Sequence, residues 1–314
     1  MENANLRKLR IRGSLMIICA TIIWGAGMAA QSAGMDYVTP LTFNAARFFI
    51  GGTIALGPAL FFLKRQKATM SQNNDKSLPI GKGTFLAGII CGIVLCLGIN
   101  LQQFGFAAGA SVANAAFITA LYVIMVPIAC LIFFKQKTPV FLWAGVAVAM
   151  AGMYFLSFAG GFNPSIGDIL IFFCAIAFSA QIIIISYFSP KHNVFALACV
   201  QFYTVFAVSM ILAFIFETPS ISALVAAGPF VLYTGVLSSG VAYILQMKAQ
   251  KTAKPTVAAV LFSFEGVAAT ITGWIVLDQF LTTRQILGCA LIFTAILVAQ
   301  IPAKTKKQRM KEQC

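Results

Sequence analysis

Long apolar runs alternate with short polar or Gly/Pro-containing breaks along the whole chain. Ten such runs cover residues 13–33, 40–63, 83–105, 111–134, 139–158, 167–188, 194–216, 228–249, 255–277 and 284–301. Each run is close to the ~20 apolar residues that a helix needs to cross a bilayer. Because the breaks are short, consecutive helices must run antiparallel and pack together. The pattern predicts an all-α integral membrane protein with ten transmembrane helices.

Charged residues are scarce and unevenly placed. The chain of 314 residues is 60% hydrophobic and 10% charged, whereas soluble domains have about 25% charged residues. With a cytoplasmic N-terminus, all but two of the 22 lysines and arginines lie in cytoplasmic tails and loops; Arg284 lies outside and Arg47 within the second run. This bias predicts a multi-pass protein of the plasma membrane (the cell inner membrane) with both termini cytoplasmic. The net charge of +14 then reflects topology, and no nucleic-acid partner is expected.

The two ends of the chain are expected to be cytoplasmic tails. Residues 1–12 carry four basic residues, as the start of a signal peptide does. The apolar run 13–33 is nevertheless too long for a typical signal peptide, so we expect it to stay as the first span. Residues 302–314 form a second basic tail.

The two halves of the chain echo each other. Matched pairs lie 154 residues apart near the start of each half and 143 residues apart later, including Gly13 with Gly167, Arg47 with Gln201, Gly92 with Gly235, Gln103 with Gln246, and Lys135 with Asp278. Each half holds five spans, an odd number, so the second copy must be inverted in the membrane. We therefore predict two inverted five-helix repeats, residues 13–158 and 159–301, around a central cavity. Inverted repeats are typical of secondary transporters, with the binding site at the repeat interface.

Glu265 is a carboxylate in the middle of an apolar run. It follows Pro255 by ten residues, which places it about 15 Å deep in a hydrocarbon layer of about 30 Å. A carboxylate there costs about 2.5–3.5 kcal/mol unless it faces a cavity or a partner. Glu265 therefore either lines a cavity, where it binds a cationic group or a proton, or braces the bundle through a hydrogen bond. Tyr122 is its counterpart at the offset of 143 and should face the same cavity.

Other polar or aromatic residues within the runs are further candidates for the transport pathway. Arg47 can attract an anionic substrate or pair with Glu265 as an internal gate; alternatively it snorkels outward or bonds to loop carbonyls. Its counterpart Gln201 keeps the polarity without the charge. The remaining polar candidates, which line the path or join helices, are Asn100, Gln103, Tyr243 and Gln246. Trp24 either offers a stacking or cation–π surface or packs against other helices or faces the lipid. Trp274 is expected to anchor the membrane interface.

Several other chemistries lack their usual sequence signals. Seven of the eight cysteines lie in apolar runs without a Cys-x-x-Cys pair, so they are best interpreted as packing residues. His192 is the only histidine, and no Gly-x-x-x-x-Gly-Lys-Ser/Thr loop occurs. We therefore expect no cofactor and no metal. The patterns Gly88-x-x-x-Gly92 and Gly105-x-x-x-Gly109 are best interpreted as packing positions that let helices approach closely or bend.

The last two runs carry a family resemblance. They contain Ala258-Ala259-Val-Leu-Phe-Ser-Phe-Glu265, then Gly273-Trp274-Ile-Val-Leu-Asp278, and finally Gly288-Cys289-Ala290. This pattern resembles the closing pair of an EamA domain in the drug/metabolite transporter superfamily, and the first half resembles it through Trp24-Gly25, Arg47-Phe48 and Phe117–Tyr122. Two positions depart from the family pattern: Gly266 stands where Pro is common after the glutamate, and Leu277-Asp278 where Gly-Glu is common. Gly266 is expected to loosen the helix where Pro would kink it.

The resemblance implies ten helices around a cavity that opens alternately to each side of the membrane. It also implies small metabolites or drug-like molecules as substrates, commonly exported, with no ATP. We therefore predict a secondary transporter, acting as a monomer or homodimer, with a proton or another ion as the candidate coupling species. A lipid flippase of the same fold is the alternative. A membrane enzyme is less favoured because it needs clustered acids or histidines near an interface.

Overall fold

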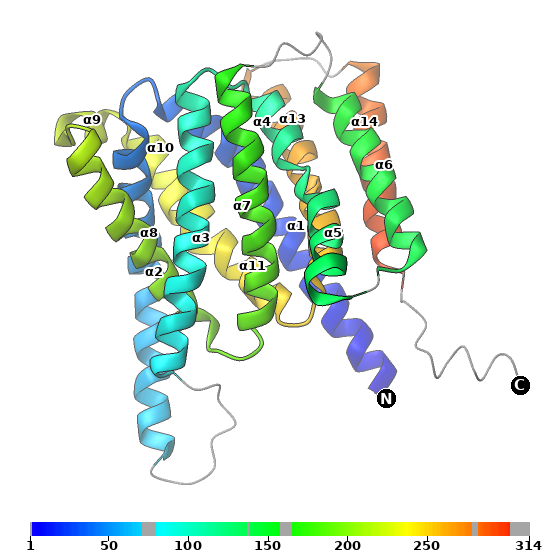
Figure 1. Cartoon of the computed structure of the whole chain (residues 1–314), viewed down its shortest axis with the longest axis horizontal. Coiled ribbons are helices and arrows are strands. Elements are labelled where there is room, and N and C mark those ends of the chain that lie inside the picture. Colours follow the sequence, from blue (N-terminus) through cyan, green and yellow to red (C-terminus); the bar gives the residue numbers. More distant parts are fainter. Residues whose placement is uncertain (1, 71–79, 137, 158–164, 278–281, 302–314) are drawn as a thin grey trace, which may run out of the picture.

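A computed structural model of the chain describes residues 2–70, 80–136, 138–157, 165–277 and 282–301. These residues form a bundle of helices (Figure 1). The first half contains α1 (Glu2–Gly34), α2 (Pro40–Met70), α3 (Lys82–Ala107), α4 (Val112–Thr119), α5 (Tyr122–Phe134) and α6 (Val140–Ser157). The second half contains α7 (Ile166–Phe188), α8 (Val194–Phe216), α9 (Ile221–Ala226), α10 (Gly228–Tyr233), the π-helix η1 (Thr234–Ala242), α11 (Tyr243–Gln250), α12 (Pro255–Phe262), α13 (Phe264–Leu277) and α14 (Thr283–Ala299).

The helices fall where the apolar runs predict them. Eight segments of the described chain are long and apolar enough to cross a membrane, and Val140–Leu156 and Thr283–Ala299 are shorter apolar helices. Each of these ten segments matches one predicted range to within a few residues, except that α1 and α2 extend beyond their runs. The prediction of an all-α membrane protein is therefore confirmed.

Internal breaks distinguish the structure from ten plain helices. The fourth span is divided between α4 and α5, the ninth between α12 and α13 at Ser263, and the eighth contains η1 between α10 and α11. The short helix α9 was also not predicted. Hydropathy locates a span but does not specify which carbonyl each amide bonds, so these breaks leave no mark on the apolar pattern.

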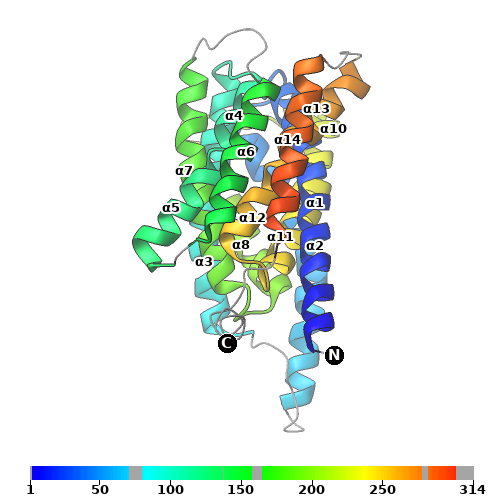
Figure 2. The same cartoon turned by 90° about the vertical axis from the view of Figure 1, so that its right-hand side faces the viewer.

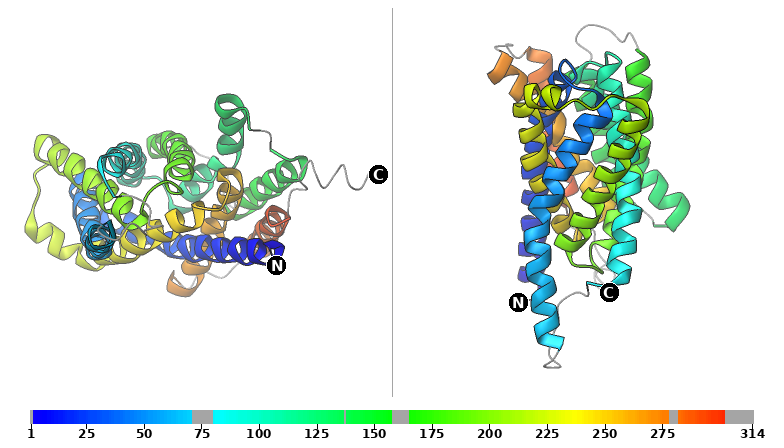
Figure 3. Two further views of the ribbon diagram at one scale, coloured as in Figure 1. Left: turned by 90° about the horizontal axis from the view of Figure 1, so that it is seen from below. Right: turned by 90° about the vertical axis from the view of Figure 1, so that its left-hand side faces the viewer.

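The two halves of the bundle are arranged with opposite directions. We call the end where α1 begins and α14 ends the lower end, as drawn in Figure 1; α7 starts at the opposite, upper end. Helix α2 packs on α8, and α6 packs on α14, at the two sides of the bundle (Figures 2 and 3). Helix α3 packs on α7 and α8, as η1 packs on α1 and α2. Because α3 corresponds to η1, α7 to α1 and α8 to α2, the two halves make equivalent contacts with each other.

Glycines let several of these helices approach closely. A methyl group placed on Gly88 would lie 2.5 Å from Val200, one on Gly92 2.5 Å from Thr204, and one on Gly105 2.6 Å from Ile171. The packing role predicted for these three glycines agrees with these contacts. Gly109 is different, because it has a φ of +88° just after α3 and has open space around it. Its role is to end the helix in the left-handed region, so the packing prediction for Gly109 is wrong.

A carboxylate joins the two halves at the upper end. Glu217, just after α8, accepts hydrogen bonds from the backbone amides of Leu41 and Thr42, both at 2.9 Å. These amides are free at the start of α2 and attract a negative charge. Glu217 therefore caps α2 across the repeat interface.

Candidate functional site

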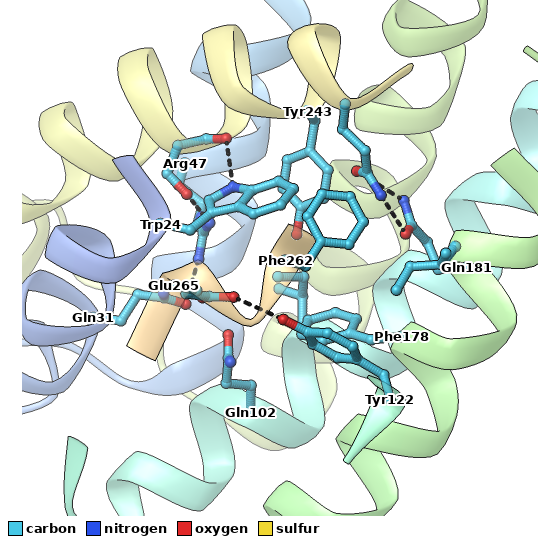
Figure 4. Close-up of a pocket in the computed structure, with 14 residues that line it drawn as sticks. Trp24, Gln31, Arg47, Gln102, Tyr122, Phe178, Gln181, Tyr243, Phe262 and Glu265 are labelled. Carbon is cyan, nitrogen blue, oxygen red and sulfur yellow. Dashed lines mark hydrogen bonds between the residues drawn. The ribbon is translucent and has the colours of Figure 1, made fainter. Parts of the chain in front are cut away.

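A cavity lies between the two repeats, and its empty space, counted together with the part open to the outside, is about 470 Å³. It is lined by Trp24, Gln31, Arg47, Ile99, Gln102, Tyr122, Phe178, Gln181, Ile182, Ser238, Tyr243, Gln246, Phe262 and Glu265 (Figure 4). These residues come from α1, α2, α3, α5, α7, η1, α11, α12 and α13, and thus from both halves. The predicted site residues Glu265, Arg47, Tyr122, Tyr243, Gln246 and Trp24 are among them.

The helix breaks place Tyr122 and Glu265 against each other. Tyr122 is the first residue of α5, and Glu265 lies in the first turn of α13, directly after the break at Ser263. The Tyr122 hydroxyl donates to Glu265 Oε2 at 3.5 Å, across the repeat interface (Figure 4). Because free amides at a helix N-terminus favour negative charge, the start of α13 stabilises a carboxylate deep in the bundle. The break therefore gives a physical reason for a glutamate at this depth.

Glu265 is incompletely paired. It lines the cavity and is partly exposed there, whereas Tyr122 is buried. The bond from Tyr122 is long for a hydrogen bond to a carboxylate, and it is the one side-chain hydrogen bond of Glu265 within the described residues. The carboxylate can therefore accept a further donor from a molecule in the cavity.

Two glycines fix the position of the Glu265 turn. A methyl group on Gly25 would lie 2.6 Å from Ala268 Cβ and 2.7 Å from the carbonyl oxygen of Glu265, so α1 lies directly against α13. A methyl group on Gly266 would lie 2.6 Å from Met153 Sδ. Gly266 was expected to loosen the helix here. The structure places the break one turn earlier, at Ser263, and Gly266 makes room for Met153.

Arg47 is buried and held by neutral oxygens. It is 1% exposed; its Nη1 donates to Gln31 Oε1 at 2.6 Å, Nη2 to Ser238 Oγ at 3.0 Å, and Nε to Ser239 Oγ at 3.2 Å. Snorkelling and bonding to loop carbonyls are therefore wrong interpretations. The expected pairing with Glu265 is not found either, because no ion pair joins these two residues in the described part of the chain.

Aromatic side chains form one wall of the cavity. The Trp24 ring lies 4.9 Å from that of Tyr243 and 5.7 Å from that of Phe262, and the Phe262 ring lies 6.2 Å from that of Tyr122. Trp24 Nε1 donates to the carbonyl oxygen of Ser238 at 3.3 Å, which fixes the indole plane. Trp24 therefore faces the cavity and not the lipid. Such a wall can contact a flat apolar group or a cation.

Two amides that bond to each other also line the cavity. Gln246 Nε2 donates to Gln181 Oε1 at 3.0 Å, and Gln181 Nε2 donates back to Gln246 Oε1 at 3.4 Å (Figure 4). Both side chains are buried, so the reciprocal pair satisfies amides that are otherwise costly in an apolar bundle. It also joins α7 to α11.

Three predicted site residues lie away from the cavity lining. Asn100 belongs to a cluster with Asn44, Ser209 and Cys96 between α2, α3 and α8. Gln103 donates to the Gln31 carbonyl oxygen at 2.9 Å and joins α3 to α1. Gln201 is fully buried, and neither polar atom of its amide has a partner among the described residues.

Sequence reasoning missed several lining residues. Gln31, Gln102 and Gln181 are amides inside apolar runs, the same signal that identified Gln103, so they could have been found. Ser238 and Phe178 give no such signal, because serine and phenylalanine are common in membrane helices. Trp274 and Asp278 lie outside the residues whose side chains the structure describes. Within the described residues, no group of three His, Cys, Asp or Glu side chains could hold a metal.

An all-α membrane protein whose repeats enclose a polar cavity has the architecture of a membrane transporter. The family model of the EamA-like transporter family matches residues 11–158 and 165–300, so the chain belongs to that family and holds two EamA repeats. The resemblance noted in the sequence is thereby confirmed.

Individual relatives agree with this assignment. The chain is 33% identical over 293 residues to an uncharacterized transporter of Archaeoglobus fulgidus, covering 93% of this chain and 87% of that protein. It is 23% identical to the uncharacterized transporter YoaV of Bacillus subtilis, covering 92% and 96% of the two chains. A crystal structure with 19% identity has the same fold, with a TM-score of 0.72 over 93% of this chain and 99% of that one.

Proposed function

We propose that the protein is a secondary transporter that exports a small organic solute across the plasma membrane by alternating access. The proposal rests on family membership and on the cavity between two oppositely directed repeats. The lining combines aromatic rings with a few amide, guanidinium and carboxyl groups, a mixture that is usual for small-molecule sites. The lysines and arginines gathered in one set of loops support the cytoplasmic placement of both termini.

The observation that carries the proposal is the incompletely paired carboxylate of Glu265 on the cavity. An ionisable group at mid-membrane is costly, and such groups usually belong to a substrate or ion pathway. Tyr122 supplies a single long hydrogen bond, and Arg47 is engaged by Gln31, Ser238 and Ser239. The carboxyl group of Glu265 is thus available to a cationic group of a solute or to a proton.

The cavity walls favour a solute with an apolar part beside a cationic group. Trp24, Tyr243 and Phe262 offer ring faces close to Glu265, and aromatic faces attract both flat groups and cations. Gln31, Gln102 and the Gln181–Gln246 pair supply amide donors and acceptors at the remaining walls.

A comparison of metabolite pools tests the function. Cells that express the wild type, cells that express Glu265→Gln and cells without the protein are compared for solutes inside the cells and in the medium. We expect the wild type to move at least one small organic solute to the medium. Glu265→Gln should insert into the membrane equally well but move far less of that solute. Equal pools in all three strains would contradict the proposed function.

A further inference from the structure

The same stretch of chain has two different helical forms in the two repeats. η1 is a π-helix over Thr234–Ala242, whereas the matching stretch Cys91–Ile99 lies within the α-helix α3. The pairs Gly92 with Gly235 and Gln103 with Gln246 lie 143 residues apart on both sides of the stretch, so neither copy contains an inserted residue. The wide turn of η1 is therefore a result of packing, and conversion to an α-helix requires no change in chain length.

η1 makes the contacts that hold the polar end of the cavity. Ser238 Oγ and Ser239 Oγ both accept from Arg47, at 3.0 and 3.2 Å, and the Ser238 carbonyl accepts from Trp24 Nε1. Neighbouring residues of an α-helix point about 100° apart. Ser238 and Ser239 are consecutive, yet both bond to the guanidinium of Arg47, and the Ser238 carbonyl bonds to the Trp24 indole. These three hydrogen bonds thus depend on the local form of this helix.

The equivalent position in the other repeat lacks these hydrogen bonds. Gln201 stands where Arg47 stands, and Cys96 where Ser239 stands, at the same offsets. Cys96 accepts a hydrogen bond from Asn100 Nδ2 at 3.1 Å, while both polar atoms of Gln201 have no partner among the described residues. A buried amide without partners is unfavourable, so Gln201 is less well satisfied than Arg47 at the equivalent position.

Close packing lets α2 sense the form of η1. A methyl group on Gly51 of α2 would lie 2.8 Å from Ser239 Cβ, and one on Gly235 of η1 would lie 2.9 Å from Ile50 Cβ. Helices α2 and η1 therefore touch along this face. Packed interfaces of this kind switch between discrete arrangements and do not deform continuously. A change in the turns of η1 must therefore shift α2.

We propose that η1 is a conformational switch and that Ser238 and Ser239 are positioning residues for Arg47. In the described state the π-helix holds Arg47. When η1 becomes α-helical, Arg47 loses its bonds to Ser238 and Ser239 and is free to move from the cavity wall toward Glu265, while the stretch Cys91–Ile99 takes up the wide turn and supplies partners to Gln201. The freed guanidinium weakens the binding of a cationic group at Glu265 and promotes its release. The inference rests on the proposed function, because alternating access is what makes two inverted repeats exchange their conformations.

Hydrogen exchange on the full-length protein in lipid nanodiscs tests the switch. The variant Ser238→Ala/Ser239→Ala removes two partners of Arg47 and should favour the α-helical form of η1. We expect exchange to change in opposite directions at the two ends of the bundle, in the α1–α2 connection (residues 35–39) and in the α7–α8 connection (residues 189–193). Ser179→Ala, which removes a bond within one helix (to the Ala175 carbonyl), is the control and should change neither end.

A second variant tests the other interface. Gln201→Leu replaces the unpartnered amide by an apolar group and should stabilise the described state, so its changes at the two ends should be the reverse of those in the serine variant. Faster exchange at both ends in either variant, or no change at either end, would overturn the switch.

The test separates this inference from the proposed function. Wild-type protein and the serine variant are reconstituted and assayed with the solute that the metabolite comparison identifies, and the serine variant should transport it several times more slowly. If the wild type transports the solute but hydrogen exchange in the serine variant does not change in opposite directions at the two ends, only the switch is contradicted. Absence of wild-type transport contradicts the proposed function.

Discussion

Arg47 and Gln201 occupy equivalent positions in the two repeats but have opposite surroundings. Arg47 has three neutral partners, and Gln201 has none among the described residues. A buried charge is tolerable only when its donors are satisfied, which explains why Gln31, Ser238 and Ser239 converge on the guanidinium. The neutral oxygens thus stabilise the Arg47 guanidinium without a carboxylate, so Glu265 is not used as its partner.

Replacement of Arg47 by alanine is expected to destabilise the protein strongly. It leaves three buried oxygens without donors, at about 1–3 kcal/mol for each unsatisfied group. We therefore expect a loss of about 3 kcal/mol or more, seen as a lower thermal unfolding temperature of the purified protein. Arg12→Ala, at an exposed position of α1, is the control. An unchanged unfolding temperature for Arg47→Ala would contradict the importance of these hydrogen bonds.

His192 gives the protein a stability that depends on pH. Its Nδ1 lies 3.0 Å from Thr84 Oγ1, and burial, followed by the charge of Lys191, lowers the pKa of His192 from its ordinary value of 6.5. The folded state thus prefers neutral imidazole, so this contribution is full above pH 6.5 and is lost as the pH falls through the lowered pKa. Thermal unfolding followed across this range should show a step in the wild type that His192→Gln lacks. Identical pH profiles would disprove this role.

The sequence identified charged residues and their depth but not their partners. Glu265 was expected to face Tyr122 because the repeat offset relates them, and they do lie together. Of the alternatives for Arg47, pairing with Glu265, snorkelling and bonding to loop carbonyls are not found in the described residues, and attraction of an anionic substrate stays a prediction. Two of its three partners, Ser238 and Ser239, lie in the π-helix η1. A π-helix has no signal in the apolar pattern.

At the scale of the helices, breaks and glycines position the site. The breaks between α4 and α5 and at Ser263 bring helix starts to the centre of the bundle, next to Tyr122 and Glu265. Gly25 then allows α1 to lie against the turn that carries Glu265. The hydrophobic pattern predicted the ends of these spans to within a few residues. It could not predict the breaks, because both sides of each break are equally apolar.

A methyl group at Gly25 is expected to displace this turn. Gly25→Ala would place Cβ 2.6 Å from the Ala269 amide nitrogen, and overpacking of this kind costs about 1–3 kcal/mol. Because that contact is with backbone, α13 must move, and transport should fall together with thermal stability. Gly57→Ala in α2 meets nothing within 4 Å and should leave both unchanged or slightly improve stability. Equal behaviour of the two variants would argue against close packing at Gly25.

At the scale of the whole molecule, the inverted repeats place a cavity at their interface and both described chain ends at one side. Figure 1 shows α1 beginning and α14 ending at the lower end. The repeat pattern predicted a central cavity, since an odd number of spans per repeat requires inversion. Its lining was predicted less well, because Asn100, Gln103 and Gln201 lie at helix interfaces outside it.

The positive-inside bias predicts which end faces the cytoplasm. Asp36, at the upper end, and Lys191, at the lower end, are both exposed in connections between helices. In intact cells, a membrane-impermeant maleimide should label a cysteine introduced at Asp36. It should label one at Lys191 only after permeabilisation, with unsubstituted protein as the background. The reverse pattern would mean that the termini are outside.

The most direct test of the account is proton-gradient-driven transport by Glu265→Gln in proteoliposomes. Glu217→Gln, a matched change at the partly exposed carboxylate that caps α2, controls for the loss of a hydrogen-bonded acid away from the cavity. With the solute found in the metabolite comparison, we expect Glu265→Gln to lose about tenfold or more of the transport rate, the equivalent of one lost charge interaction. Glu217→Gln should transport at close to the wild-type rate. Transport by Glu265→Gln at the wild-type rate, with the same pH dependence, would contradict the central role of this carboxylate.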